Sequence, residues 1–288
     1  MTSKSSNLNT PLSPAMRQRL TTIQGYVFDM DGTLILGNKH GQGFSVLPGA
    51  IELLQWLRQN NIPFIVFTNG TARPPRHYAA QLREAGLDVG DTEMMTPATC
   101  AADVFSQKNY KKVMVMGGDG LSQPLQEVGL ETCASRGQHD VDAVFAGWFR
   151  EFGMEDLEAA YYAVSRGANF YSASEAPFFA TASGPALGTS RVISAMIKDV
   201  TGCDVHVVGK PAQAALQSAA KRLQLPASDI AVVGDDPELE VPMALKGGSL
   251  AIAVTTGLAT ADTYRNKPAD QQPDLLLDNV ASLLRHLQ

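Results

Sequence analysis

Short apolar runs alternate with helical patterns along almost the whole chain of 288 residues. The run YVFDM near the start is followed by IELLQWLRQ, in which apolar residues recur at helical spacing, and then by FIVF. Similar apolar runs return downstream as VMVM, AVFA, VHVV, IAVV and LAIAV, and most of them precede another helical pattern. Strands that alternate with helices indicate parallel sheets with helices on both faces. We therefore predict an α/β fold.

Polar residues follow these apolar runs at three places and open a helix at a fourth. The segments are FDMDGT at 28–33, FTNG at 67–70, VGKP at 208–211 and VGDD at 233–236. In an open parallel sheet the functional crevice lies at the carboxyl ends of the strands, so we expect the four segments to meet there. Together they supply three carboxylates, a hydroxyl, an amide and an ammonium group, from Asp29, Asp31, Asp235, Thr68, Asn69 and Lys210.

This combination of side chains fits phosphoryl transfer. Clustered carboxylates repel one another unless a cation lies among them, and a hard ion such as Mg2+ prefers oxygen ligands. An ionised carboxylate can attack phosphorus to form an aspartyl-phosphate, and a second acid can protonate the leaving oxygen and then activate water. A lysine and a cation offset the charge on the transferring oxygens. Each segment alone is typical of a turn or a helix start, so it is the complete set that favours chemistry.

The spacing of the segments predicts a second domain. Thr68 and Lys210 lie 210 − 68 = 142 positions apart, whereas one βαβ unit needs only about 30 residues. The residues between them have their own alternation of strands and helices, so the insert is a domain and not a long loop. We predict a flexible tail over 1–21 that runs into a short first helix, a discontinuous core over 22–95 and 206–288, and an inserted domain over 96–205.

The segments resemble the motifs of the haloacid dehalogenase (HAD) superfamily. FDMDGTL matches its first motif, and the resemblance implies that Asp29 is the nucleophile and Asp31 the general acid and base. FTNG matches the second motif, which implies phosphate binding by Thr68 and by backbone groups of Asn69 and Gly70. The resemblance favours a phosphatase over a dehalogenase, because the dehalogenase branch lacks the second acid.

GKP and VGDD match the third and fourth motifs through Lys210 and Asp235. The resemblance implies that Lys210 binds the phosphate and supports catalysis. It also implies that Mg2+ is held by Asp29, by the backbone carbonyl of Asp31 and by Asp235.

The place of the insertion resembles that of the C2-type cap in HAD class IIA, the NagD-like and 4-nitrophenylphosphatase-like enzymes. LPGAIELLQWLRQNNIPFIVFTNG resembles the start of their core, and GPALGTS and AVTTG resemble later segments. The resemblance extends from about residue 22 to near the end of the chain. It implies a Rossmann-like parallel-sheet core and an α/β cap that closes over the site and selects the substrate.

Two segments depart from the family's pattern. The fourth motif often carries a second Asp five positions after the first, where this chain has Glu240, so either Glu240 or Asp236 supports a metal-bound water. Relatives often carry Thr-Asn-x-Asp in the cap, where this chain has SASEAPFF at 172–179, and this difference prevents the transfer of a relative's substrate. The stretch 176–190 is rich in Pro, Gly and small residues, and we expect a loop there.

The leading functional hypothesis is a Mg2+-dependent phosphatase that hydrolyses small phosphorylated metabolites through an aspartyl-phosphate intermediate. The resemblance implies nucleotides, phosphoglycolate, pyridoxal phosphate and sugar phosphates as candidate substrates. One alternative is a phosphotransferase or phosphomutase that uses the same nucleophile. Another is a sugar-phosphate-binding regulatory module without turnover, which the complete set of motif residues disfavours.

Composition excludes several kinds of partner. A net charge of −6 without a block of Lys and Arg disfavours nucleic-acid polymers and anionic membranes. No run approaches the roughly 18 apolar residues of a membrane span, and the N-terminus lacks the apolar core of a secretory signal. The three cysteines (Cys100, Cys133 and Cys203) form no CxxC pair and fit thiols in a reducing cytoplasm. Homodimerisation through the cap is common among the relatives, although no exposed apolar stripe indicates it here.

Overall fold

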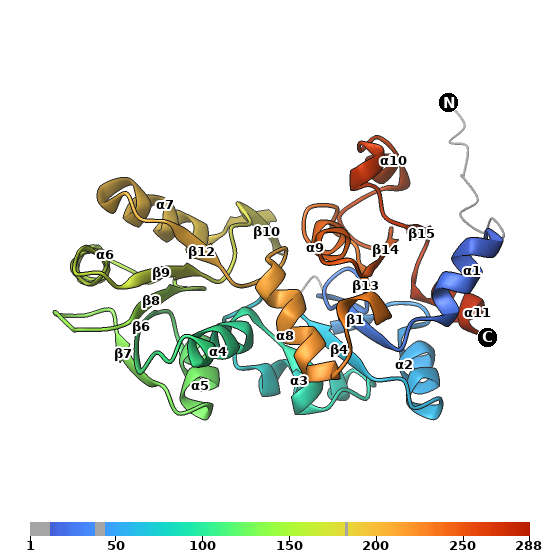
Figure 1. Ribbon diagram of the computed structural model, residues 1–288, viewed down its shortest axis with the longest axis horizontal. Coiled ribbons are helices and arrows are strands. Elements are labelled where there is room, and N and C mark those ends of the chain that lie inside the picture. Colours follow the sequence, from blue (N-terminus) through green and yellow to red (C-terminus); the bar gives the residue numbers. More distant parts are fainter. Residues whose placement is uncertain (1–11, 38–43, 182–183) are drawn as a thin grey trace. The chain divides into compact units, whose positions relative to one another are not determined.

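The structure is a computed structural model that describes residues 12–37, 44–181 and 184–288. The described chain divides into two compact units, each of which gathers segments that are distant in the sequence (Figure 1). The first unit contains the residues up to Phe67, Gln81–Glu93 and Ala219–Gln288, and the second contains Thr68–Ala80 and Met94–Ser218. Each unit has its own parallel sheet and its own apolar core.

The first unit is built on a sheet of parallel strands. In spatial order these are β15 (Leu275–Leu277), β14 (Leu250–Val254), β13 (Ile230–Gly234), β1 (Gly25–Asp29) and β4 (Phe64–Phe67). Phe28 of β1 pairs with Val233 on one side and with Val66 on the other. Every residue of β1, β13 and β14 is buried, and because consecutive side chains point to opposite faces, both faces of the sheet are covered.

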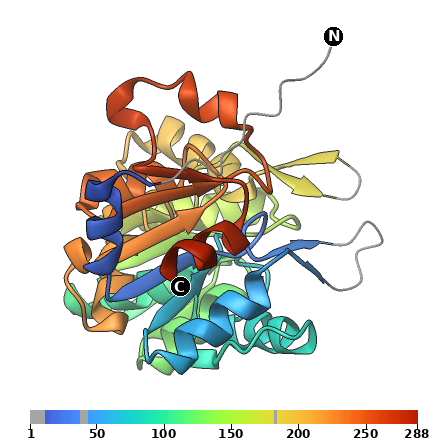
Figure 2. The same cartoon turned by 90° about the vertical axis from the view of Figure 1, so that its right-hand side faces the viewer.

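The packing of α2 (Ala50–Gln59) shows how an amphipathic helix joins this unit. The helix buries three leucines at helical spacing and leaves its polar side chains on the other face. Gly49 precedes it with a φ of 84°, and a Cβ on this residue would lie 2.4 Å from the Cβ of Ala281 in α11 (Val280–Leu287). Glycine therefore permits both the left-handed turn and the close approach of α11, which lies beside α2 in Figure 2.

The rest of the first unit consists of short helices, turns and one hairpin. The helices are α1 (Pro14–Thr21), α9 (Glu240–Gly247) and α10 (Ala261–Arg265), with single 3-10 turns at η1 (Asp91–Glu93), η2 (Ala227–Asp229) and η3 (Ala269–Gln271). The hairpin pairs β2 (Ile35–Gly37) with β3 (Phe44–Val46). Two further helices, α3 (Pro75–Glu84) and α8 (Gln213–Leu223), contribute residues to both units.

The second unit contains another parallel sheet. Its strands follow the order β12 (Val205–Val207), β9 (Asn169–Ser172), β8 (Ala143–Ala146), β6 (Lys112–Met116) and β7 (Glu131–Ala134). Its other elements are β5 (Met94–Met95), α4 (Pro97–Gln107), α5 (Asp119–Glu127), α6 (Met154–Ser165), α7 (Thr189–Thr201) and the hairpin of β10 (Phe178–Thr181) with β11 (Gly184–Leu187).

Helices cover both faces of this second sheet. Val144 of β8 belongs to a buried cluster with Ala160 of α6 and Ile193 of α7. Its neighbour Phe145 points the other way and packs edge-on against Phe105 of α4, with 5.8 Å between ring centroids. The predicted α/β fold with parallel sheets and helices on both faces is therefore confirmed.

The short first helix expected at the end of the tail is α1, at residues 14–21, which buries Leu20, while residues 1–11 lie outside the described part of the chain. One local expectation needs correction. The expected loop over 176–190 contains the hairpin of β10 and β11 and the first turn of α7; residues 182–183 are not described. Backbone pairing between the two hairpin strands outweighs the weak strand propensity of their Gly, Pro and Ala residues.

The two units do not have the limits of the predicted domains. The segments 68–80 and 206–218, which the sequence assigns to the core, group with the second unit. The compact units are defined by contacts in the folded chain, whereas the predicted domains are defined by where a stretch of sequence is inserted. The two kinds of limit need not coincide, so the predicted domain limits stay a prediction. In the described part of the chain, no helix has the length and apolar character needed to cross a membrane.

Candidate active site

The first motif ends the central strand of the first unit. Asp29 is the last residue of β1, is only 8% exposed, and pairs in register with Phe67, the residue before Thr68 in the chain. The turn that follows is closed by backbone hydrogen bonds from Gly32 N to Ile35 O and from Ile35 N to Met30 O. This turn leaves the side chain of Asp31 exposed.

The fourth motif ends the neighbouring strand. Asp235 follows β13 directly and is 2% exposed. One of its carboxylate oxygens accepts a hydrogen bond from the hydroxyl of Thr33 (3.5 Å), and the other accepts one from the backbone N–H of Leu258 (2.8 Å). A Cβ on Gly257 would lie 1.8 Å from Oδ2 of Asp235, and one on Gly32 would lie 2.3 Å from it. Two glycines are therefore required where the backbone passes the carboxylate.

Glu240 and Asp236 differ in burial and in hydrogen bonding. Glu240 is 2% exposed, and its Oε2 accepts a hydrogen bond from the backbone N–H of Asp236 (3.2 Å). Asp236 is less buried, and its own carboxylate accepts a hydrogen bond from the backbone N–H of Glu238 (2.7 Å), which closes the turn after the motif. We refer to Asp29, Asp31, Asp235 and Glu240 together as the acidic group.

A tyrosine that no sequence motif indicates lies beside the acidic group. Tyr264 of α10 is 1% exposed, and its hydroxyl has no hydrogen-bond partner among the described residues. Burial raises the pKa of Tyr264, and the negative charges of Asp235, Glu240, Asp236 and Asp29 raise it further. The hydroxyl is therefore a protonated donor at neutral pH.

The second motif lies in the second unit. Thr68 is 5% exposed; its backbone N–H donates to the carbonyl oxygen of Met95 (3.2 Å), and its hydroxyl oxygen accepts a hydrogen bond from Gly70 N (3.0 Å). Because the hydroxyl oxygen is the acceptor here, the hydroxyl hydrogen is directed toward another acceptor. We predicted that the N–H of Gly70 binds phosphate. In this structure it donates instead to the hydroxyl of Thr68 within the same loop.

The third motif joins the second through the side chain of Asn69. Its Nδ2 donates to the carbonyl oxygen of Lys210, and its Oδ1 accepts from the backbone N–H of Lys210, both at 2.9 Å. The side chain of Lys210 is 1% exposed, and a Cβ on Gly209 would lie 2.2 Å from the carbonyl oxygen of Ala173. We refer to Thr68, Asn69, Gly70 and Lys210 as the lysine group.

Four distant segments thus form two groups, one within each unit. The acidic group unites the first and fourth motifs, and the lysine group unites the second and third; the meeting of all four segments at one crevice stays a prediction. Buried carboxylates attract cations, and a buried ammonium group is suited to an anion. The assigned roles of these residues remain predictions.

The acidic group has the donor chemistry that Mg2+ requires. The predicted ligands are two carboxylates and a backbone carbonyl, which are hard oxygen donors. Among the described residues, no three His, Cys, Asp or Glu side chains gather as ligands of one ion. The predicted set does not need a third side chain, and Asp29 and Asp235 are buried at the ends of neighbouring strands, so the residues fit the ion.

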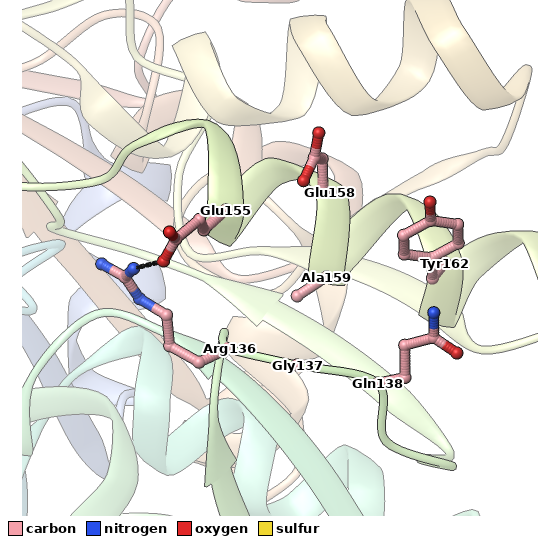
Figure 3. A pocket seen from close by; sticks show the side chains of 7 residues that line it. All are labelled: Arg136, Gly137, Gln138, Glu155, Glu158, Ala159 and Tyr162. Atoms are coloured by element: carbon pink, nitrogen blue, oxygen red, sulfur yellow. Dashed lines mark hydrogen bonds and ion pairs between the residues drawn. The ribbon is translucent and has the colours of Figure 1, made fainter.

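A surface pocket of the second unit is separate from both groups. Figure 3 shows Arg136 turned toward Glu155, with which it forms an ion pair, and Asp156 lies 3.4 Å from the same guanidinium. The positive charge is therefore already offset, and the pocket offers no unbalanced charge to a phosphate. None of the predicted site residues lines it; its residues are Arg136, Gly137, Gln138, Glu155, Glu158, Ala159 and Tyr162.

Comparisons with known proteins agree with the motifs. A family model described as haloacid dehalogenase-like hydrolase matches residues 26–131, and one described as HAD-hydrolase-like matches residues 207–283. An acid sugar phosphatase of Staphylococcus haemolyticus is 30% identical over 251 residues, which cover 87% of this chain and 91% of the relative.

Solved structures share the fold. The glycerol phosphate phosphatase of Mycobacterium tuberculosis, solved in complex with calcium, is 26% identical, with a TM-score of 0.79 over 92% of this chain and 76% of that one. NagD of E. coli K-12 is 24% identical, with a TM-score of 0.79 over 90% of this chain and 97% of that one. The second likeness concerns the fold alone.

Proposed function

This chain belongs to the haloacid dehalogenase-like hydrolases, and we propose that it is a NagD-like member that hydrolyses small phosphorylated metabolites with the help of Mg2+. Membership of this family and its phosphatase relatives make it a phosphoric monoester hydrolase.

The burial of two carboxylates at neighbouring strand ends is the main support for this function. Asp29 and Asp235 are both buried and end neighbouring strands of one sheet. Two carboxylates buried at adjacent strand ends are costly without a cation, so their position favours a role in binding one. The same arrangement supplies a carboxylate oxygen that can act as a nucleophile.

The covalent steps belong to Asp29 and Asp31. A carboxylate oxygen of Asp29 attacks phosphorus, an aspartyl-phosphate forms, and the bond to the leaving oxygen breaks as Asp31 gives that oxygen a proton. Asp31 then takes a proton from the water that attacks the phosphorus, and inorganic phosphate leaves with Asp29 restored. The exposure of Asp31 supports this role, because an exposed carboxyl group exchanges protons readily.

The lysine group holds the phosphate in this scheme. The ammonium group of Lys210 offsets negative charge on the phosphate oxygens, and the hydroxyl of Thr68 donates a hydrogen bond to one of them. The two hydrogen bonds from the side chain of Asn69 fix the backbone of Lys210, which limits the positions that its side chain can reach. Backbone N–H groups at Asn69 and Gly70 are further donors, and that of Gly70 must first leave the hydroxyl of Thr68.

Mg2+ would be held by Asp29, Asp235 and the backbone carbonyl of Asp31. When bound, the ion supplies positive charge that stabilises the transferring phosphoryl oxygens. Between the two candidates for an outer ligand, we favour Glu240 over Asp236. This choice is supported by the burial of Glu240 and by the hydrogen bond that engages the carboxylate of Asp236 with Glu238.

We propose sugar phosphates and related polyol phosphates as the substrate class. The acid sugar phosphatase and the glycerol phosphate phosphatase among the relatives support this choice. Nucleotides, phosphoglycolate and pyridoxal phosphate are the competing candidates from the sequence.

The test measures phosphate release in two stages. Turnover of 4-nitrophenyl phosphate is measured with Mg2+ and after its removal by EDTA; activity should be lost with EDTA and return with added Mg2+. A panel of sugar phosphates, glycerol phosphate, nucleotides, phosphoglycolate and pyridoxal phosphate then ranks the substrates by kcat/KM. Activity that survives EDTA contradicts the role of the metal, and a nucleotide or pyridoxal phosphate at the head of the ranking contradicts the substrate class.

The phosphotransferase alternative uses the same nucleophile and is separated by the acceptor. With an added sugar or glycerol present, a transferase passes the phosphoryl group to the alcohol, so less inorganic phosphate appears per substrate consumed. A phosphatase releases one phosphate per substrate whether or not the alcohol is present.

We further propose a cytoplasmic location, which is supported by the three cysteines, since each is a thiol and none is joined to another. Homodimerisation stays a prediction from the family resemblance.

A further inference from the structure

The hydroxyl of Tyr264 is unusual because it is buried without a hydrogen-bond partner among the described residues. The residue is 1% exposed. A buried hydroxyl without a partner is costly, and in native proteins such a group calls for an explanation, such as strain, a catalytic role or a bound water or ion. Phenylalanine would fill the same space without this cost.

The segment that carries Tyr264 is attached to the fourth motif at both ends. Before α10, the backbone N–H of Leu258 donates to Asp235 at 2.8 Å. After α10, the ammonium group of Lys267 forms an ion pair with Glu238, which lies between Asp236 and Glu240 in the chain. Tyr264 lies between these two attachments.

Four carboxylates lie close enough to the phenol to act on its pKa. The charges that act on Tyr264 come from Asp235, Glu240, Asp236 and Asp29, in decreasing order, and all of them raise its pKa. The phenol therefore keeps its proton. A protonated phenol has one hydrogen to donate and lone pairs that accept hydrogen bonds.

We propose that Tyr264 is a positioning residue for the cation of the acidic group: its oxygen accepts a hydrogen bond from a water molecule in the hydration shell of the cation. Mg2+ keeps several of its waters when it binds to proteins, and water held by a cation is a strong donor. Groups that orient metal ligands from the outer shell commonly change metal affinity by about 10- to 100-fold. This inference rests on the proposed Mg2+ site.

The test compares Tyr264→Phe with the wild-type chain, using Mg2+ itself as the probe. Titration calorimetry on EDTA-treated protein should show a Kd for Mg2+ that is about tenfold higher in the variant. The Mg2+ concentration for half-maximal turnover of 4-nitrophenyl phosphate should rise by the same factor, while kcat at saturating Mg2+ stays within about twofold. Without metal, the Tm of Tyr264→Phe should equal or exceed that of the wild type, because the variant no longer buries an unpartnered hydroxyl.

Tyr26→Phe is the matched control. Tyr26 is also 1% exposed, lies in the same unit three positions before Asp29, and has a pKa raised by burial alone. Its loss of a hydroxyl should leave the Kd for Mg2+ unchanged.

The outcomes separate this inference from the proposed function. A wild-type Kd in Tyr264→Phe overturns the inference, and so does a lower Tm of the metal-free variant, because the hydroxyl would then be bonded within the protein. If the wild type itself binds no Mg2+, the proposed function fails as well. If the wild type and Tyr26→Phe bind Mg2+ equally and Tyr264→Phe binds it about tenfold more weakly, the inference stands.

Discussion

The acidic group and the lysine group differ in the charge that they offer and in how their members are held. Asp235 of the acidic group is held from outside, by a hydroxyl and a backbone N–H from other segments, and glycines make room for it. In the lysine group, Asn69 holds the backbone of Lys210 and leaves the ammonium group for other partners. In the proposed function, the acidic group receives a cation and the lysine group receives an anion. We therefore expect substitutions of the metal-binding carboxylates to weaken Mg2+ binding, and substitutions in the lysine group to weaken the binding and turnover of phosphate esters.

The largest effect is expected for Asp29→Asn. The amide cannot attack phosphorus, so kcat for 4-nitrophenyl phosphate should fall by about 10^4-fold or more. Asp88→Asn, which changes an exposed Asp in an ion pair with Arg58, is the control and should keep wild-type turnover. If Asp29→Asn keeps more than about a hundredth of the activity, the carboxylate is not the nucleophile.

Lys210→Met should weaken phosphate handling without changing the cation site. Methionine keeps much of the buried chain and removes the charge, and loss of one such stabilising group lowers kcat/KM by about 10^2- to 10^3-fold. The Kd for Mg2+, measured by calorimetry without substrate, should stay at the wild-type value. A parallel loss of Mg2+ affinity would remove the distinction between the two groups.

Asp235→Asn should weaken Mg2+ binding, which Lys210→Met leaves unchanged. Replacing a ligand carboxylate by a neutral amide of the same shape should weaken Mg2+ binding by at least about 10- to 100-fold. Turnover should recover in part as Mg2+ is raised, whereas Lys210→Met should not recover. An unchanged Mg2+ requirement would show that Asp235 does not hold the ion.

The smallest effect is expected for Asn69→Ala. The change leaves the N–H and the carbonyl of Lys210 without their partners, which should lower the free energy of unfolding by about 1–3 kcal/mol. Urea denaturation measures this loss, and KM for phosphate esters should rise only a few-fold. Asn60→Ala, which removes one exposed hydrogen bond to Trp56, should cost about 0.5 kcal/mol or less. Equal losses of unfolding free energy in Asn69→Ala and Asn60→Ala would contradict the role of Asn69 in holding the backbone of Lys210.

The strands and their polar ends could be predicted because their pattern is local. β1 and β13 are buried throughout, so their sequences are continuous apolar runs, and the acids at their ends stand out. The proposed choice of Glu240 over Asp236 could not be made from the sequence, because it depends on burial and on which backbone N–H each carboxylate meets. The β10–β11 hairpin escaped prediction since pairing between its strands outweighs weak local propensity.

Tyr264 could not be found from the sequence at all. It lies in a five-residue helix without a motif, and only the folded chain brings it beside carboxylates from β1 and the turn after β13. The limits of the two units were likewise hidden, since contacts made after folding draw 68–80 and 206–218 into the second unit.

The pair of hydrogen bonds between Asn69 and Lys210 has a consequence for protein engineering. These residues are 141 positions apart, and the bonds fasten the strand end that leads into the intervening stretch to the loop that leads out of it. The stretch therefore behaves as a cassette whose two ends are fixed to each other, whatever lies between them. A chimaera that keeps Asn69, Lys210 and their flanking turns could accept a foreign cassette and so acquire a new substrate preference while keeping the proposed phosphate-binding residues in place.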